Sequence, residues 1–381
     1  MDLAMPDGKP QAKYTESPCR RLLNYEPLLG KKKMAKEKLQ RIDSNKEMRD
    51  LLLPYCRLKY GQVWEDSVSG HKIGCLDAVS EKDIQTLMGN NKATLAVQDP
   101  PYNVVVGNIN SDRLGRIPIE KYMDWSRKWI YNTYRILKDN AHIYIWLGAD
   151  QNDGFQPLPN FMIMMREFKE LKTRSFITMR NQRGYGTQKN WMAVRQELLY
   201  YIKGNPQFNV DAEYTDIPKI LRGYYKKVNG QITENLERSK SENIRAGNVW
   251  VDVQQVFYRM EENVPGCYAQ KPLKAIERII SASSATDDLI VDFFAHAGTT
   301  LIAAEELKRH CFTIDIDPIF AEITIRRLEH YRKTGETGWQ FKTPFSEVDI
   351  AWPNDIDCEQ GNVMETKRAA KLLFDYSNVE K

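Results

Sequence analysis

The clearest pattern in the chain is a short apolar run, a loop of mostly small residues and a segment with apolar residues at helical spacing. Residues 289–291 read Leu-Ile-Val, residues 292–300 form the loop, and Leu301, Ala304 and Leu307 follow. This order predicts a buried strand, a tight turn and a helix. Such a unit turns backbone N–H groups and a helix N-terminus toward the polar end of a ligand.

A second apolar run, Leu-Ala-Val, is followed directly by Gln-Asp-Pro-Pro-Tyr at residues 98–102. The ionised carboxylate of Asp99 can only accept hydrogen bonds, whereas Pro100 and Pro101 have no N–H group and fix φ. Tyr102 adds a flat apolar face with a polar tip. Together these residues predict a rigid acceptor for an amino group beside a stacking surface. The alternative interpretation is a proline-rich turn with a capping aspartate.

Two more carboxylates end predicted strands. Asp292 follows the run at 289–291, and Asp315 follows an apolar segment at 311–314. A carboxylate at a strand tip can bind an ammonium or hydroxyl group. An acid one βα unit beyond a small-residue loop typically accepts hydrogen bonds from ribose hydroxyls, so Asp315 is the candidate for that contact.

With these motifs in this order, the sequence resembles the S-adenosylmethionine-dependent amino-methyltransferases of DNA, in the permuted β arrangement with the catalytic motif first. The resemblance spans about residues 62–332 and includes Gln270-Lys271-Pro272 ahead of the cofactor strand. It implies an α/β fold of the Rossmann-like class I methyltransferase type, with a doubly wound, mostly parallel sheet. In such a sheet the two motifs open onto one crevice.

The resemblance also implies roles for individual residues. Asp99 and the Pro100 carbonyl would accept hydrogen bonds from the target amine, Tyr102 would stack on the base, and Pro101 completes the motif. The cofactor would be S-adenosyl-L-methionine. The residues that would hold it are Lys271, Asp292, Phe294, Ala295, Gly298, Thr299 and Asp315. The substrate would be double-stranded DNA, with the target base flipped out of the helix.

Adenine N6 is the predicted target, because family members with aspartate at the position of Asp99 more often act on adenine and those with serine more often act on cytosine. Cytosine N4 is the alternative. A nucleic-acid-binding protein on an inactive methyltransferase scaffold is a further interpretation, as is an enzyme acting on structured RNA or a protein amide. A homodimer and a cognate restriction endonuclease are the partners that we consider for such an enzyme.

The family usually has glycine where this chain has His296. Glycine permits a left-handed φ and close approach of a ligand, so the histidine either tolerates a different φ or narrows the pocket. The five histidines and six cysteines show neither metal-ligand spacing nor a C-x-x-C pair, and we predict no metal site.

Basic residues concentrate between residues 166 and 203. This segment contains nine lysines and arginines but only three acidic residues. Residues 180–191 also interleave amides, glycines and aromatics, which suit phosphate contact and base stacking. We predict a lid over the pocket that contacts DNA; the alternative is a solvated loop between strands at 174–179 and 197–202. The predicted DNA-binding residues are Arg180, Arg183, Lys189, Lys226 and Lys227.

At 381 residues with a net charge of +4, the chain is long enough for one large α/β core with an insertion and extensions. It has no apolar run near the roughly 20 residues of a membrane span and no signal peptide, so we expect a cytoplasmic protein of a prokaryote or phage.

We expect an N-terminal extension (1–61), a methyltransferase domain (62–335) and a C-terminal extension (336–381). Within the domain, residues 62–203 form the catalytic half, 204–265 the target-recognition region and 266–335 the cofactor half. The charged segment from Lys31 to Asp50, with Leu39, Ile42 and Met48 as a thin apolar stripe, is interpreted as a solvated helix. A DNA-facing arm or a dimer contact is the alternative. The aromatics of the C-terminal extension would cap the core or a partner subunit.

Overall fold

The computed structural model describes residues 41–43, 45–103, 117–148, 157–187, 190–212, 214–218, 225–234, 242–257, 259–340 and 342–348. Side chains are not described at 181–187, 190–193, 225–228 and 232–234. All of these residues belong to one compact unit, Leu39–Lys381. None of the helices in these ranges is both long and apolar enough to cross a membrane.

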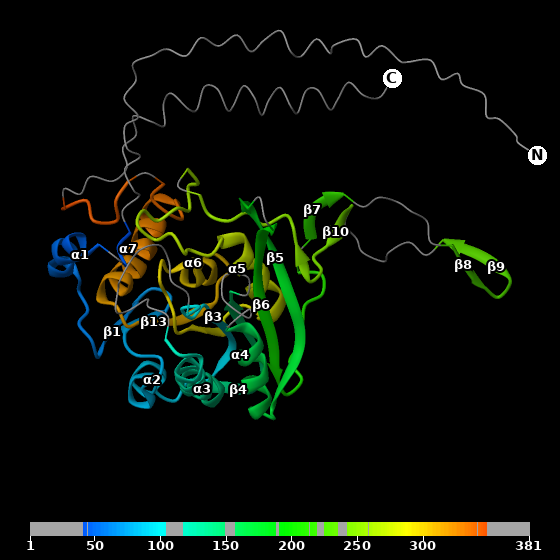
Figure 1. The fold of residues 1–381 in the computed structure, drawn as a ribbon, viewed down its shortest axis with the longest axis horizontal. Helices are drawn as coiled ribbons and strands as arrows, with labels where there is room; N and C mark the ends of the chain where they lie inside the picture. The colour runs from blue at the N-terminus through cyan, green and yellow to red at the C-terminus, as the bar shows by residue number, and fades with distance from the viewer. Residues whose placement is uncertain are drawn as a thin grey trace, which may run out of the picture. The chain divides into compact units, whose positions relative to one another are not determined.

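A nine-stranded sheet forms the centre of this unit (Figure 1). In spatial order its strands are β1 (Gln62–Glu65), β2 (Lys72–Cys75), β13 (His310–Asp315), β12 (Leu289–Asp292), β3 (Ala93–Gln98), β4 (Leu137–Leu147), β6 (Asn190–Lys203), β5 (Leu171–Thr187) and β11 (Val249–Trp250). The strands from β2 to β4 pair in parallel, whereas β1, β6 and β5 join antiparallel. The predicted α/β fold with a mostly parallel sheet is confirmed.

The two motif strands, β3 and β12, are neighbours, with Leu95 opposite Ile290 and Ala96 opposite Val291. From β3 the chain continues to β4 on one side, and from β12 it continues to β13 on the other. The strand order therefore reverses between β3 and β12. In doubly wound sheets such a reversal opens a crevice at the carboxyl ends of the strands.

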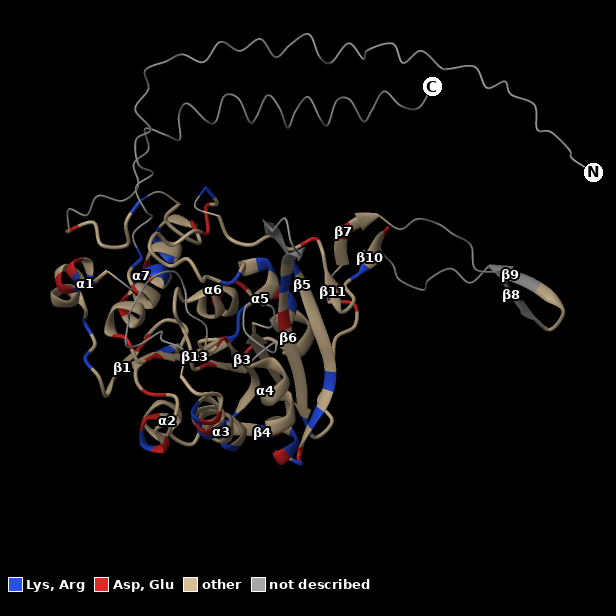
Figure 2. Cartoon of the chain, in the orientation of Figure 1, with Lys and Arg blue, Asp and Glu red and all other residues tan. Residues whose placement is uncertain are grey.

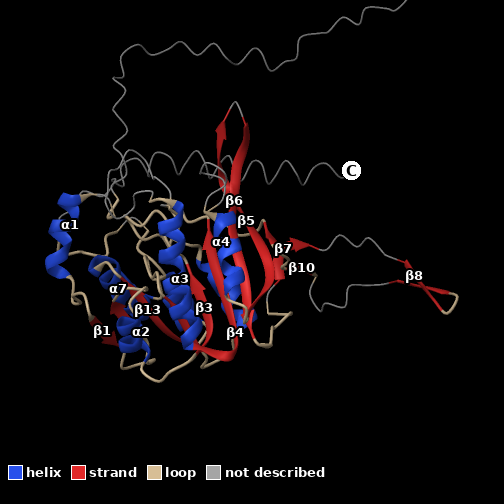
Figure 3. Ribbon diagram, turned by 60° about the horizontal axis from the view of Figure 1, so that its bottom comes forward, coloured by secondary structure: helices blue, strands red, loops and turns tan. Residues whose placement is uncertain are grey.

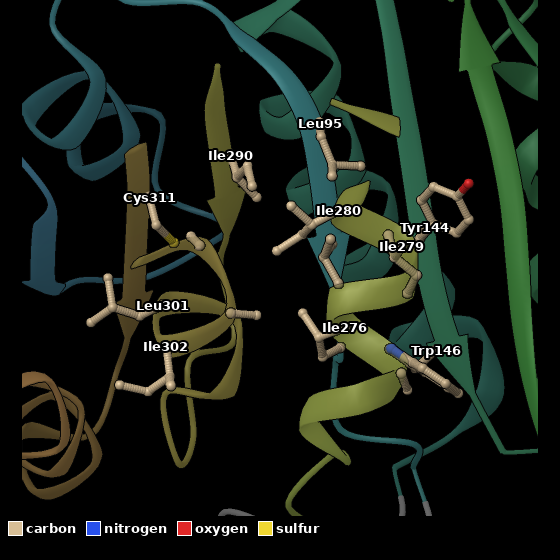
Figure 4. Packing of buried hydrophobic residues seen from close by; sticks show 14 of the residues in the cluster. Leu95, Tyr144, Trp146, Ile276, Ile279, Ile280, Ile290, Leu301, Ile302 and Cys311 are labelled. Atoms are coloured by element: carbon tan, nitrogen blue, oxygen red, sulfur yellow. The ribbon is translucent and has the colours of Figure 1, made fainter. Parts of the chain in front are cut away.

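Helices cover both faces of the sheet (Figure 3). Leu95 and Val97 of β3 belong to the cluster with α5 (Leu273–Ser283), α6 (Thr299–Glu306) and α7 (Pro318–Thr334), and Figure 4 shows α5 side chains packed toward β3 and β4. Ala96 belongs to the opposite cluster, with α2 (Glu81–Met88), α3 (Ile119–Ile136) and α4 (Leu158–Met164). This alternation is the period of two expected of a strand buried on both faces.

The region predicted to recognise the target contains short strands. β7 (Tyr214–Pro218) pairs antiparallel with β10 (Asn243–Arg245), and β8 (Tyr225–Val228) pairs with β9 (Gln231–Glu234). Trp250 is buried, as expected of a core aromatic. The assignment of this region to target recognition stays a prediction.

The N-terminal segment differs from its prediction. Residues 41–43 form a turn and coil, and only α1 (Lys46–Leu52) is helical, capped by the Asn45 side chain. Ile42, Met48 and Leu52 are buried against α7, and Arg49 pairs with Asp317 at 2.6 Å. The solvated-helix interpretation is therefore wrong for this part; residues 31–40 lie outside the described residues.

The start of the C-terminal extension packs against the same cluster. Trp339 and Phe345 are buried beside Ile319 and Ile323 of α7. The prediction that these aromatics cap the core is confirmed for this pair. Trp352, by contrast, lies outside the described part of the chain.

Candidate active site

Asp99 lies directly behind β3 with both carboxylate oxygens engaged. Oδ1 accepts a hydrogen bond from the Tyr102 hydroxyl at 2.8 Å, and Oδ2 lies 2.5 Å from Lys271 Nζ. Lys271 is almost fully buried and lies two residues before α5. This pair joins the predicted catalytic motif to the predicted cofactor half across 172 positions of sequence. The capping-aspartate alternative does not account for such a partner.

The proline turn is held by side chains from neighbouring elements. The Tyr122 hydroxyl of α3 donates to the Pro101 carbonyl at 2.7 Å. Asn103, at a left-handed φ of 57°, exchanges two hydrogen bonds with the backbone of Ile117. Gly148, just after β4, faces the Tyr102 ring so closely that a Cβ there would lie 2.9 Å from Cδ2. These contacts fix the direction of the Tyr102 ring.

Lys271 also lies near aromatic faces. Its Nζ is 5.2 Å from the centre of the Tyr102 ring and 5.4 Å from that of Trp146. Both distances are within the range of cation–π attraction. The ammonium is therefore held by one carboxylate and two rings, and it holds Asp99 in turn.

At the end of β12, Asp292 is buried and has neutral donors only. Oδ1 accepts from the Phe294 N–H at 2.9 Å, and Oδ2 accepts from the Thr300 hydroxyl at 2.6 Å. Burial raises the pKa of Asp292 to about 7, because a buried carboxylate loses its hydration. Phe294 packs edge-on against Trp129 at 5.3 Å.

Asp315, at the end of β13, has a similar environment. Its oxygens accept from the N–H groups of His296 at 3.0 Å and Asp317 at 2.9 Å, and burial raises its pKa to about 7. Two adjacent strand ends thus carry carboxylates that are only partly charged at neutral pH.

The loop between Asp292 and α6 is compact. Gly298 has a φ of 75°, and a Cβ there would lie 3.0 Å from Thr324 Cγ2, so this position requires glycine. Arg327 of α7 is fully buried and donates to the Ala297 carbonyl at 2.8 Å and the Thr299 hydroxyl at 3.0 Å. His296 keeps a left-handed φ of 44° although it is not glycine. The structure therefore retains the loop conformation that a glycine would allow.

The two motifs line one pocket that is open to solvent. Of the predicted residues it contains Asp99, Lys271, Asp292, Phe294, Ala295 and Thr299. Tyr102 contacts the site through Asp99, Gly298 shapes the loop, and Asp315 holds it through the His296 N–H. The prediction that both motifs open onto one crevice is confirmed.

The predicted basic loop is mostly strand. β5 extends to Thr187 and β6 begins at Asn190, so the hairpin is longer than the strands predicted at 174–179 and 197–202. Backbone pairing between the two strands replaces the loop. Lys172, Arg174 and Arg180 of β5 and Arg195 of β6 are exposed, and Figure 2 shows basic residues along these strands.

The other predicted DNA contacts are less completely described. Arg183 lies on β5 and Lys226 and Lys227 lie on β8, but the structure does not describe the side chains of these three residues. Lys189 lies outside the described residues.

Several site residues were not predicted from the sequence, among them Thr300, Gln98, Trp146 and Arg327. Gln98 Oε1 accepts from the Phe293 N–H at 2.9 Å and ties β3 to the cofactor loop. Trp146 lines the pocket. Arg327 anchors the cofactor loop through its hydrogen bond to the Ala297 carbonyl. A polar residue inside a buried strand was the available signal for Gln98, whereas nothing in the local pattern distinguishes Arg327 from a surface arginine of a helix.

Comparison with known proteins shows to which family the chain is similar. The DNA methylase family matches residues 93–326, more than half of the chain. The chain is 26% identical over 239 residues to Type II methyltransferase M.HpaI of Haemophilus parainfluenzae, covering 63% of this chain and 69% of that protein. It is 28% identical over 276 residues to DNA adenine methyltransferase YhdJ of Escherichia coli (strain K12), covering 67% and 86%.

Among solved structures, the cytosine-N4-specific PvuII DNA methyltransferase aligns with a TM-score of 0.49 and 14% identity. The alignment covers 70% of this chain and 86% of that protein.

Proposed function

This chain belongs to the DNA methylase family, the S-adenosylmethionine-dependent amino-methyltransferases of DNA, and from that premise we propose that it methylates the N6 amine of adenine. The observation that carries the proposal is the position of Asp99. Its carboxylate lines the same pocket as the strand-end acid Asp292 and is oriented by Lys271 and Tyr102.

Adenine is favoured over cytosine by the aspartate at position 99, as the family resemblance implies. The relative YhdJ is named an adenine methyltransferase and matches 67% of this chain, which supports the same choice. Cytosine N4 is the second candidate, because both amines present N–H groups that a carboxylate can accept.

The proposed role of Asp99 follows from the chemistry of an exocyclic amine. The nitrogen lone pair is delocalised into the ring, so the amine is a weak nucleophile until acceptors draw on its N–H groups. A carboxylate has about four acceptor positions, and Lys271 and Tyr102 engage one on each oxygen. The remaining positions suit the amine, with the Pro100 carbonyl as second acceptor. Positioning and electrostatics then lower the barrier.

The pocket residues fit the proposed cofactor, which supplies a methyl group activated by a sulfonium. Asp292 offers a carboxylate for the ammonium of the methionine end, and Asp315 offers one for the ribose hydroxyls. Phe294 lines the pocket and would flank the sulfonium, where an aromatic face stabilises positive charge. Ala295, Gly298 and Thr299 keep the loop small enough for close approach. Lys271, already paired with Asp99, would lie between cofactor and base.

We further propose that the target base leaves the DNA duplex and stacks on Tyr102. An amine inside a duplex is paired, so it reaches a recessed carboxylate only if the base is flipped out. The ring of Tyr102 is held by Gly148 on one side and by its hydroxyl contact to Asp99. A fixed ring loses little entropy on stacking.

The β5–β6 hairpin is the proposed DNA-binding surface. Arg180 and Arg195 lie directly opposite each other on the two strands, and Arg195 Nε pairs with Glu197 at 3.1 Å. The exposed guanidinium of Arg180 beside this pair suits contact with phosphate. Arg183, Lys189, Lys226 and Lys227 are proposed as further contacts. A homodimer and a cognate restriction endonuclease stay predictions.

The test is transfer of tritiated methyl groups to double-stranded DNA, followed by nucleoside chromatography. We expect label in N6-methyladenine. Label in N4-methylcytosine would replace the leading candidate by the second, and absence of label with many DNA sequences, from protein that binds the cofactor, would contradict both.

A further inference from the structure

His296 has an unusual backbone conformation at the edge of the pocket. Its φ of 44° lies in the left-handed region, which a side chain with a Cβ rarely adopts. Strain of this kind persists only where the surrounding structure imposes it, and it concentrates at ligand sites. Here the His296 N–H donates to Asp315 and the next residue's carbonyl is held by Arg327.

His296 lies where it can meet a ligand. It packs against Phe320 at 4.8 Å between ring centres, and His296 lines the pocket together with Asp99, Lys271 and Asp292. No described residue hydrogen-bonds to either ring nitrogen, although the side chain is only half-buried. Burial lowers the pKa of His296 to about 4, so the ring is neutral at physiological pH and has one donor and one acceptor nitrogen.

Two side-chain donors of the pocket already have partners, because Lys271 pairs with Asp99 and Thr300 donates to Asp292. Asp99 and Asp292 are acceptors and suit an ammonium. The indole N–H of Trp146 has no described partner either, but it is buried. His296 is half-buried and lines the pocket.

We infer that the imidazole of His296 donates a hydrogen bond to the carboxylate at the methionine end of the bound cofactor. This inference rests on the proposed function. It makes His296 a cofactor-specificity residue of this chain. At this position the family usually has glycine, which has no side chain to offer such a contact.

Two ligands and two variants test the inference by calorimetry. S-adenosylhomocysteine contains the amino-acid end, whereas methylthioadenosine shares the adenosine and sulfur but has no carboxylate. His296→Gly removes the imidazole and the backbone strain together. Lys308→Gly is the matched control, because Lys308 is also left-handed, with a φ of 58°, but is exposed and absent from the pocket lining.

We expect His296→Gly to weaken S-adenosylhomocysteine binding about tenfold, as for one hydrogen bond to a charged group, and to leave methylthioadenosine binding unchanged. Lys308→Gly should bind both ligands as the wild type does. Without ligand, both variants should melt at the wild-type temperature or above, because glycine relieves the strained φ. A folded His296→Gly protein with weakened affinity would then be explained by the missing contact.

Equal affinity of wild type and His296→Gly for S-adenosylhomocysteine would overturn the inference, as would an equal loss for both ligands. Neither result touches the proposed function, since the wild type would still bind the cofactor product. Failure of the wild-type protein to bind S-adenosylhomocysteine would instead contradict the proposed function itself.

Discussion

The three strand ends at this site hold their carboxylates in two opposite ways. At the end of β3, Asp99 is paired with the Lys271 ammonium and the Tyr102 hydroxyl. At the ends of β12 and β13, Asp292 and Asp315 have only neutral donors. Burial raises the pKa of each of these two to about 7.

This difference separates two tasks within one pocket. A carboxylate held by an ammonium and a hydroxyl keeps its orientation before any substrate arrives. A buried carboxylate with neutral partners gains most when a ligand brings a positive charge or hydroxyl donors. We therefore assign Asp99 to the reacting amine and Asp292 and Asp315 to the cofactor.

The largest expected effect is on catalysis. Asp99→Ala should lower the rate of methyl transfer by at least about a hundredfold, the order found when one preorganised electrostatic contact is removed. The measurement is the initial rate at saturating cofactor. Asp99→Asn serves as the control for folding, because its amide oxygen can still accept from Lys271. A normal rate in Asp99→Ala would disprove the catalytic assignment.

Loss of the Asp292 carboxylate should weaken the binding of S-adenosylmethionine. Asp292→Ala, and Asp292→Asn as its isosteric partner, should weaken S-adenosylmethionine binding by more than about tenfold, because a charge-assisted hydrogen bond to the ammonium is lost. Thermal shift against cofactor concentration reports this loss. If both variants are stabilised by cofactor as much as the wild type is, the ammonium is bound elsewhere.

Two variants, Tyr102→Phe and Tyr102→Ala, separate the stacking role of the ring from the hydrogen-bonding role of its hydroxyl. On the sequence alone, Tyr102→Phe would be nearly harmless if stacking were the whole role. The hydroxyl contact to Asp99 changes this expectation, and we predict about a tenfold lower rate. Tyr102→Ala should additionally weaken the hold on the flipped base. Single-turnover rates with excess DNA, compared across the two variants, distinguish the contributions.

The raised pKa values predict a pH dependence of stability. Between about pH 4 and 7 the folded protein binds protons at Asp292 and Asp315 that the unfolded chain releases, so the stability from these groups is lost as pH rises through about 7. Asp292→Asn removes one such group. From pH 6 to pH 8 the wild type should lose about 1 kcal/mol more unfolding free energy than Asp292→Asn. Urea titrations without cofactor measure this difference, and parallel curves would contradict it.

The smallest effect concerns the hairpin. Arg180→Ala, Arg183→Ala and Lys189→Ala should each reduce the log–log salt slope of DNA binding by about one unit, because each phosphate contact releases one counterion. Fluorescence anisotropy at several salt concentrations gives the slope. An unchanged slope in all three variants would leave these residues as ordinary surface.

Much of the site could be predicted because its signals are local. The runs before Asp99 and Asp292 are apolar and end in acid, so their strands and their meeting at one crevice follow from the sequence. The pairing of Lys271 with Asp99 joins residues 172 positions apart, and no local pattern contains it.

The N-terminal segment shows a second limit of sequence reasoning. The stripe of Leu39, Ile42 and Met48 is too thin to predict burial. The apolar surface that covers Ile42 and Met48 belongs to α7 and to Trp339 and Phe345. Similarly, alternation cannot predict how far β5 and β6 extend, since glycine and charged residues interrupt it.

The division of tasks between the strand ends is tested most directly by calorimetry of S-adenosylhomocysteine binding to wild type, Asp99→Ala and Asp292→Ala. We predict that Asp99→Ala binds as tightly as the wild type while transferring no methyl group at a measurable rate, and that Asp292→Ala binds weakly. Equal loss of affinity in both variants would contradict the account, because the two carboxylates would then serve the same ligand.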